Sequence, residues 1–225
     1  MQNDEKRIAG EAAVELVRDG MTLGLGTGST VAFFLKALGE KVRLGMKVRG
    51  VPTSERTAHL CHQLGIELLD FASVDRLDLN VDGADEVDHD FRMIKGGGGA
   101  LLREKLVALA SRRNVIIADS SKAVERLGAF PLPVEIVRFG HHQIKRRIEE
   151  MGVRSTLRIT GDVPYITDNG HYILDCQTGP IPDPAALEAR LKSVTGVVDT
   201  GLFLCHCHTL IIGKGDEAIR RNKQD

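Results

Sequence analysis

Short apolar segments alternate with amphipathic helical segments through the first half of this 225-residue chain. The spacing of apolar residues predicts strands at 21–25, 47–51, 66–69, 77–81 and 114–118, and helices at 4–18, 31–38, 54–64 and 100–112. Strands joined by helical crossovers lie parallel to one another, and the crossover helices then cover the faces of the sheet. The pattern therefore predicts an α/β, Rossmann-like fold with a largely parallel sheet flanked by helices.

The rhythm changes after the proline-containing segment 130–133. Beyond it we expect strands at 134–138 and 153–159, a hairpin at 165–174 turning at 168–170, helices at 141–151 and 184–194, and strands near 197 and at 209–212. This mixture is typical of an α+β lobe. We therefore expect an α/β domain made of residues 1–129 plus 206–225, and a smaller α+β domain at residues 130–205.

The charge balance excludes several classes of partner. Thirty basic residues against thirty-one acidic ones leave a net charge of −1, which favours neither nucleic acid nor an anionic membrane. No apolar run approaches the roughly 20 residues needed to span a bilayer, and the polar, acidic N-terminus is unlike a signal peptide. Four cysteines in a chain of this length do not indicate a disulfide scaffold. We expect a cytoplasmic protein that acts on a small molecule.

A run of four glycines follows Lys95 and leads into the helix expected from Ala100. Each glycine costs roughly 0.5–1 kcal/mol relative to alanine, so a folded chain keeps such a run where φ is positive or where a ligand touches the backbone. The start of a helix attracts anions, and Lys95 adds a positive charge beside it. Glu104 places a carboxylate one turn into the helix, whose apolar stripe is expected at Leu101, Leu102, Leu106 and Leu109. Donors for a developing negative charge thus lie close to a possible base, which suggests an enzyme site.

The segment Gly24-Leu-Gly-Thr-Gly-Ser-Thr30 lies where a strand is expected to turn into a helix. Its glycines allow a ligand to approach the backbone, and its hydroxyls lie beside the start of the helix, so it is a plausible phosphate cradle. It departs from the G-x-G-x-x-G pattern and lacks the lysine of a P-loop. A capped helix start after a tight turn explains the segment equally well.

An acidic segment, Asp82-Gly-Ala-Asp-Glu-Val-Asp88, directly follows the strand expected at 77–81. Ligands of open α/β sheets bind at the carboxyl ends of strands, which makes this a possible substrate site. The spacing does not match a calcium loop. For the cluster taken alone, a solvated acidic turn is the favoured interpretation, and a divalent-metal site is a third option.

Two further segments carry reactive groups. Lys122 follows the strand expected at 114–118. An ordinary surface role is the usual one for a lysine, and the position at a strand end adds contact with a substrate anion as an alternative. The segment Cys205-His-Cys-His208 suggests a metal site. On a strand, however, alternation would point both cysteines to one face and both histidines to the other, so the four cannot converge on zinc. We expect no metal there and two cysteines packed inward.

The motifs GLGTGST, VDGADEVD, IKGGGGALLREK and IADSSK, in this order, resemble those of the ribose-5-phosphate isomerase family, type A. The resemblance continues through FPLPVE at 130–135, TDNG at 167–170 and LD at 174–175, and so spans nearly the whole chain. It implies an α/β domain with a small α+β domain, assembled as homodimers or homotetramers. It also implies interconversion of D-ribose 5-phosphate and D-ribulose 5-phosphate without a metal or organic cofactor.

The resemblance also implies a role for each matched residue. Glu104 corresponds to the general base that moves a proton between C2 and C1 through a cis-enediolate. Asp82 and Asp85 correspond to residues that hold sugar hydroxyls and assist ring opening. Lys95 and the loop that follows it would stabilise the enediolate oxygen. The remaining residues implied to bind substrate are Lys6, Thr27, Gly28, Ser29, Thr30, Gly83, Ala84, Gly96, Gly97, Gly98 and Lys122.

Two other functions compete with the isomerase. An oxidoreductase would use Gly24–Thr30 to bind a dinucleotide, and Arg49 near the end of the second strand would restrict it to NADP. A non-catalytic sugar-phosphate sensor would need the loops but not the carboxylate of Glu104. The oxidoreductase leaves the segment from Lys95 to Glu104 without a task, and formation of ketose from ribose 5-phosphate separates the isomerase from the sensor.

Overall fold

The computed structural model describes residues 2–223, whose contacts group them into two units. Unit 1 contains residues up to 84, 103–123 and those from 205 onward, and unit 2 contains residues 85–102 and 124–204. The chain therefore crosses from one unit to the other four times. The glycine run belongs to unit 2, although the sequence boundaries drew it into the α/β domain.

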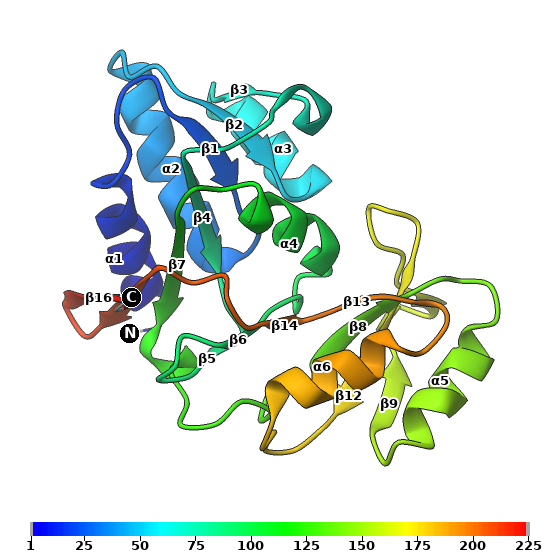
Figure 1. Cartoon of the computed structure of the whole chain (residues 1–225). Coiled ribbons are helices and arrows are strands. Elements are labelled where there is room, and N and C mark those ends of the chain that lie inside the picture. The colour runs from blue at the N-terminus through cyan, green and yellow to red at the C-terminus, as the bar shows by residue number, and fades with distance from the viewer. Residues whose placement is uncertain (1, 224–225) are drawn as a thin grey trace. The chain divides into compact units, whose positions relative to one another are not determined.

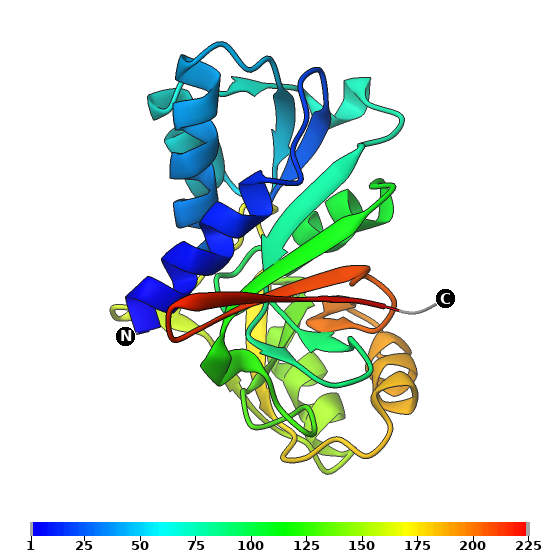
Figure 2. The same ribbon diagram turned by 90° about the vertical axis from the view of Figure 1, so that its left-hand side faces the viewer.

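A seven-stranded sheet forms the centre of unit 1 (Figure 1). Its strands, in spatial order, are β16 (Glu217–Asn222), β15 (Thr209–Lys214), β7 (Asn114–Asp119), β4 (Leu79–Gly83), β1 (Thr22–Leu25), β2 (Arg49–Pro52) and β3 (Glu67–Leu68). Every neighbouring pair is parallel except β15 and β16, which form an antiparallel pair at one edge (Figure 2). The largely parallel sheet predicted from the βα alternation is confirmed.

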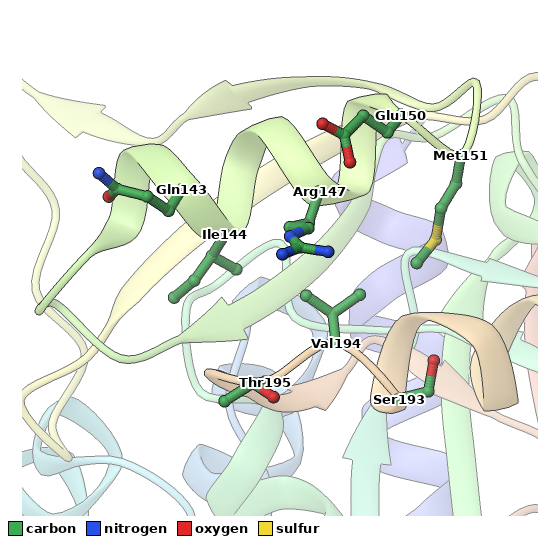
Figure 3. A pocket seen from close by; sticks show the side chains of 8 residues that line it. All are labelled: Gln143, Ile144, Arg147, Glu150, Met151, Ser193, Val194 and Thr195. Atoms are coloured by element: carbon green, nitrogen blue, oxygen red, sulfur yellow. The ribbon is translucent and has the colours of Figure 1, made fainter.

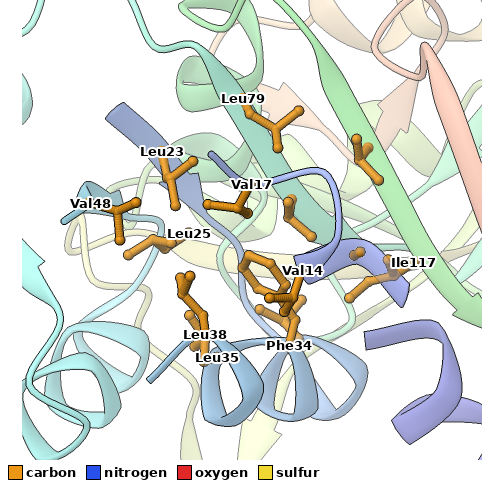
Figure 4. Close-up of a cluster of buried hydrophobic side chains, with 14 of the residues drawn as sticks. Val14, Val17, Leu23, Leu25, Phe34, Leu35, Leu38, Val48, Leu79 and Ile117 are labelled. Atoms are coloured by element: carbon orange, nitrogen blue, oxygen red, sulfur yellow. The ribbon is translucent and has the colours of Figure 1, made fainter. Parts of the chain in front are cut away.

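Helices cover both faces of this sheet. The helices are α1 (Gln2–Val14), α2 (Ser29–Arg43), α3 (Glu55–Gln63) and α4 (Leu101–Leu109), and two 3-10 turns are η1 (Phe71–Ser73) and η2 (Ser120–Lys122). Leu23 and Leu25 of β1 pack against Phe34 of α2 in one buried cluster (Figure 4). Val107 of α4 belongs to a second cluster, and a Cβ on Gly24 would lie 2.5 Å from its Cγ1. Because Gly24 points away from Leu23 and Leu25, α4 lies on the opposite face.

The apolar stripe predicted for α4 is wrong at its last two residues. Leu106 and Leu109 are 46% and 66% exposed, whereas Val107 is buried. The missing side chain of Gly24 explains the difference, because it lets Val107 approach the sheet closely and so decides which side of the helix turns inward. Glu104, a charged residue, lies on the buried side.

Unit 2 contains an antiparallel sheet in the order β13 (Val197–Thr200), β8 (Leu132–Ile136), β12 (Tyr172–Gln177) and β9 (Arg154–Leu157). Helices α5 (His141–Glu149) and α6 (Pro184–Lys192) pack on it through a cluster that includes Val134, Ile148 and Leu191. Two smaller sheets are formed by β14 (Leu202–Phe203), β6 (Met93–Ile94) and β5 (Glu86–Val87), and by β10 (Ile159–Thr160) and β11 (Val163–Pro164).

The hairpin predicted at 165–174 is wrong, although its turn is present. Gly170 N–H donates to the Thr167 carbonyl at 2.8 Å, which closes the turn. The strand that follows pairs with β8 and β9, and the short hairpin of this region is β10–β11. Thr167 donates its hydroxyl to the buried Glu135 carboxylate at 2.9 Å and its N–H to the His171 carbonyl at 2.9 Å, so the turn is held by a side chain as well as by its own backbone. None of the helices among residues 2–223 is long and apolar enough to cross a bilayer.

Candidate active site

Asp82 lies at the carboxyl end of β4, the edge of a parallel sheet where ligands bind. Its side chain is 1% exposed, and Oδ1 accepts hydrogen bonds from the backbone N–H groups of Thr27 at 3.1 Å and Gly83 at 2.8 Å. The acidic segment is thereby joined to the first glycine loop, two motifs that are separated by 55 residues in sequence.

The first glycine loop is held by a cluster of hydroxyls. Thr27 Oγ1 lies 2.7 Å from Ser54 Oγ and 2.8 Å from Thr53 Oγ1, so this hydroxyl supports the loop. Ser54 also caps α3 by accepting the Thr57 N–H at 3.1 Å. At the start of α2, Gly28 gives no side-chain cap and Ser29 is exposed. The N–H groups of this helix start are thus suited to an anion.

Glu104 lies in the first turn of α4, where the helix dipole favours a carboxylate. The helix leads into β7, which is parallel to β4, so its N-terminus lies at the carboxyl edge of the sheet. Arg103 donates to Glu55 Oε1 at 2.7 Å and ties this turn to the start of α3. Glu104 is 3% exposed, and it belongs to the same unit and the same edge as Asp82.

The start of α1 is fastened to the same edge. Glu5 Oε2 accepts from the backbone and hydroxyl of Ser120, at 3.0 and 2.7 Å, and its Oε1 accepts from the Gly215 N–H at 3.0 Å. These hydrogen bonds, that from Gly215 first, lower the pKa of Glu5. Lys6 directly follows Glu5 on α1, and Lys122 lies two residues after Ser120 on η2. The hydrogen bonds between Glu5 and Ser120 therefore join the two elements that carry these lysines.

In unit 2 the glycine loop adopts a conformation that depends on its glycines. Gly96 and Gly99 have φ values of 99° and 82°, and the Gly99 N–H donates to the Gly96 carbonyl at 2.9 Å. Gly97 and Gly98 are exposed at the tip of this turn. Asp85 Oδ2 accepts the Gly97 N–H at 2.7 Å, so this carboxylate positions the loop.

Lys95, at the beginning of the loop, is 3% exposed. Its backbone N–H donates to the Gly201 carbonyl at 2.9 Å, and its Nζ lies 5.4 Å from the centroid of the Phe203 ring. The structure thus groups the predicted residues into two sets. Lys6, the 27–30 loop, Asp82 to Ala84, Glu104 and Lys122 belong to unit 1, while Asp85, Lys95 and Gly96 to Gly98 belong to unit 2.

The acidic segment is not the solvated turn that its composition favoured. Glu86 is 3% exposed and accepts the backbone N–H groups of Gly128 and Phe130, both at 2.6 Å. Asp88 is 4% exposed and pairs with Arg92 Nε at 2.7 Å. These two carboxylates hold loops of unit 2. Among residues 2–223, no three metal-ligating side chains lie close enough together to bind an ion.

The Cys205–His208 segment is bent and is not a strand, so the predicted alternation does not apply. Cys207 is buried, and burial raises the pKa of its thiol to about 12. Cys205 is exposed, which corrects the expectation that both cysteines pack inward. His208 Nδ1 accepts the Asn114 N–H at 3.0 Å and so has a structural role.

A pocket of about 510 Å³ lies in unit 2 beside α5 and the residues that follow α6 (Figure 3). None of the predicted site residues lines it. The lining residues are Gln143, Ile144, Arg147, Glu150, Met151, Ser193, Val194 and Thr195.

Sequence reasoning missed the residues that support the glycine loop from a distance. Arg158 donates to the carbonyls of Gly96 and Gly97, and it is held by Asp175. The hydroxyl of Tyr165 lies 2.2 Å from the position of a Cβ on Gly99. Only Asp175 fell within a recognised motif, and nothing local in the sequence connects these residues to a loop some 60 positions away.

The chain is similar to known proteins along most of its length. The family described as ribose 5-phosphate isomerase A (phosphoriboisomerase A) matches residues 49–217. Ribose-5-phosphate isomerase A of Agrobacterium fabrum is 53% identical over 94% of this chain and 94% of its own length, and that of Bacillus mycoides is 50% identical over 92% and 95%.

Two solved structures share the fold closely. Ribose 5 phosphate isomerase A from Neisseria gonorrhoeae is 40% identical, covers 100% of this chain and 99% of its own, and superposes with a TM-score of 0.93. A D-ribose-5-phosphate isomerase in complex with phospho-erythronic acid is 34% identical, with 99% coverage of both chains and a TM-score of 0.95.

Proposed function

The chain belongs to the ribose 5-phosphate isomerase A family, and we propose how its own residues carry out the reaction of that family. The protein is an enzyme that interconverts D-ribose 5-phosphate and D-ribulose 5-phosphate. We therefore prefer the isomerase to the two other functions considered above, an NADP-dependent oxidoreductase and a sugar-phosphate sensor. The observation that carries the proposed roles is the buried Glu104 at the carboxyl edge of the sheet, in the same unit as Asp82.

Glu104 is the proposed general base. Its carboxylate removes the proton from C2 of the open-chain aldose, the electron pair forms the C1–C2 double bond, and negative charge moves to the carbonyl oxygen. The hydroxyl proton on O2 moves to O1, and the same carboxyl then returns its proton to C1 of the cis-enediolate, so that O2 becomes the carbonyl oxygen of the ketose. Such proton transfer by a positioned side chain contributes about 10²–10⁴-fold to the rate.

Lys95 and the loop of Gly96, Gly97 and Gly98 are proposed to stabilise the enediolate oxygen. A donor that is already aimed at a developing oxyanion contributes about 2.7–4 kcal/mol in comparable sites. The Gly97 N–H is already bonded to Asp85, so Gly98 supplies the backbone donor in this proposal. The buried Lys95 adds a full positive charge.

The phosphate and hydroxyls of the sugar require other groups. We propose that the start of α2, from Gly28 to Thr30, binds the phosphate together with Lys6, and that Lys122 contacts the substrate as an anion partner. The exposed Ser29 hydroxyl and the helix N-terminus support this assignment. Asp82 and Asp85 hold sugar hydroxyls, with Gly83 and Ala84 providing the backbone between them.

The test of this proposal is a comparison of wild type with Glu104→Gln, a variant that keeps the size of the side chain but cannot accept the proton. Phospho-erythronic acid is a suitable binding probe, because it joins a phosphate to a planar carboxylate. The variant should bind this probe with near wild-type affinity and lose roughly 10²-fold or more in kcat. Wild type in D₂O should also place deuterium in the product, and the variant should not. Turnover within a factor of about three of wild type would assign the base to another carboxylate, with Asp85 tested next.

The remaining proposals concern the location, the oligomeric state and the cofactor requirement of the enzyme. We propose that the protein acts in the cytoplasm as a homodimer or homotetramer. We also propose that it needs no metal or organic cofactor, because Lys95 and backbone donors supply the charge stabilisation. Activity should therefore survive exhaustive EDTA treatment. Loss of activity that one divalent ion restores would contradict the proposal, and sedimentation of the purified protein gives the oligomeric state.

A further inference from the structure

Arg158 forms hydrogen bonds both to an acidic side chain and to the glycine loop. Its Nε donates to Asp175 Oδ2 at 2.9 Å and its Nη2 pairs with Asp175 Oδ1, which fixes the plane of the guanidinium. The remaining nitrogen, Nη1, donates to the Gly96 carbonyl at 2.9 Å and to the Gly97 carbonyl at 3.2 Å. The Arg158 side chain is 15% exposed, so the guanidinium is largely shielded from water, although its bond to the exposed Gly97 lies at the surface.

These bonds set the direction of two peptide groups. In a trans peptide the carbonyl and the N–H point in opposite directions. With the Gly96 carbonyl on Arg158, the Gly97 N–H points the other way, and there Asp85 accepts it at 2.7 Å. With the Gly97 carbonyl on Arg158, the N–H of Gly98 must likewise point away from the guanidinium.

We propose that Arg158, oriented by Asp175, is a positioning residue that aims the Gly98 N–H at the enediolate oxygen and strengthens it as a donor. The inference rests on the proposed role of the glycine loop. A cation bonded to a carbonyl polarises the whole amide, so the N–H of the same peptide becomes a better donor. Arg158 itself does not touch the substrate.

The glycines make this support necessary. Gly97 and Gly98 are both exposed and carry no side chain, so the peptide between them is free to rotate by half a turn if nothing holds its carbonyl. The rotated peptide would present a carbonyl oxygen to the oxyanion in place of the N–H. Gly96 is less dependent on Arg158, because its carbonyl also accepts the Gly99 N–H.

The strand pairing next to Arg158 does not need the side chain. The backbone N–H of Arg158 donates to the Ile173 carbonyl at 2.9 Å, and its carbonyl accepts from Tyr165 N–H at 2.9 Å. A truncated side chain leaves both bonds in place. Arg158→Ala should therefore fold, and its defect should lie in the loop.

The experiment compares wild type, Arg158→Ala, Arg158→Lys and Asp175→Asn, with Arg154→Ala as the control, since Arg154 is an exposed arginine on β9. Arg158→Ala should lose about 10²-fold in kcat, the effect of one oxyanion donor, while KM for ribose 5-phosphate stays within about three-fold. Arg158→Lys and Asp175→Asn should fall in between, because each keeps part of the bonding. Millimolar guanidinium should partly restore Arg158→Ala but not Glu104→Gln, and urea should restore neither.

Three kinetic results would overturn the inference: a kcat for Arg158→Ala within about three-fold of wild type, a defect confined to KM, or no rescue by guanidinium. A crystal structure of Arg158→Ala provides a readout that does not depend on activity. It should show the Gly97–Gly98 peptide turned or in two orientations, and an unchanged loop contradicts the inference whatever the activity is. If the wild-type protein did not isomerise ribose 5-phosphate, the proposed function itself would be wrong. The failure of the proposed function is therefore distinguishable from the failure of the inference about Arg158.

Discussion

Glu86→Gln tests whether the acidic segment contains structural as well as functional carboxylates. Both oxygens of Glu86 accept backbone N–H groups at 2.6 Å, from Gly128 and Phe130, and the side chain is 3% exposed. Glutamine keeps one acceptor oxygen but turns an NH₂ group toward the other N–H. A hydrogen bond to a charged group contributes about 1.5–3 kcal/mol, and a buried unsatisfied donor costs about 1–3 kcal/mol.

The expected loss in the free energy of unfolding is therefore about 2.5–6 kcal/mol, since one charged bond is lost and one N–H is left without an acceptor. The Gly128 turn has little room to adjust, because a Cβ on Gly128 would lie 1.9 Å from the Gly179 carbonyl oxygen. Urea unfolding followed by far-UV circular dichroism measures the loss. Activity per folded molecule should not change, because Glu86 faces loops and not the proposed site.

Glu125→Gln is the matched control, since Glu125 is an exposed acid in the segment just before Gly128. Its effect on unfolding should stay within about 0.5 kcal/mol. If Glu86→Gln were as stable as this control, the two short hydrogen bonds would not support the loop. If it were stable but inactive, Glu86 would belong to the catalytic machinery and the division of the acidic segment would be wrong.

Three other predictions follow from individual groups. Hydrogen bonds from Gly215 and Ser120 lower the pKa of Glu5 in the folded state, so the unfolded state binds more protons in acid and stability should fall as pH drops below the ordinary value of 4.5. Glu5→Gln should flatten this part of the Tm-against-pH curve, and an unchanged slope would contradict the assignment. Cys205 is exposed while burial raises the pKa of the other three thiols to about 12, so mass spectrometry after brief iodoacetamide treatment of native protein should find Cys205 alkylated first. Lys122→Ala should fold normally and lower kcat/KM sharply, and wild-type kinetics would make Lys122 an ordinary surface residue.

Much of unit 1 was predictable because its signals are local. The alternation of strands and helices requires only residues that are neighbours in sequence, and it led to the parallel sheet that is observed. The cap at Ser54 was predictable for the same reason, since donor and acceptor are three residues apart. The glycine run likewise indicated a special backbone, and Gly96 and Gly99 do have positive φ.

The inward face of α4 could not be read from its own sequence. Leucine spacing favoured Leu106 and Leu109, but the side that packs is chosen by the gap above Gly24 on β1, which admits Val107. The turn at 168–170 was recognised, yet its strand partners were not, because those partners are chosen by the sheet and by the buried Glu135.

Sequence alone determined the family, the parallel sheet and the residue types available for proton transfer, because each of these depends on short motifs whose members are adjacent in the chain. Tertiary structure decided which of those residues are held by others. It separated Glu86, which supports loops of unit 2, from Asp82 at the edge of the sheet in unit 1, and it brought Arg158 to carbonyls 61 and 62 residues away. Hydrogen bonds of this kind depend on distance in space, and the folded chain alone sets that distance.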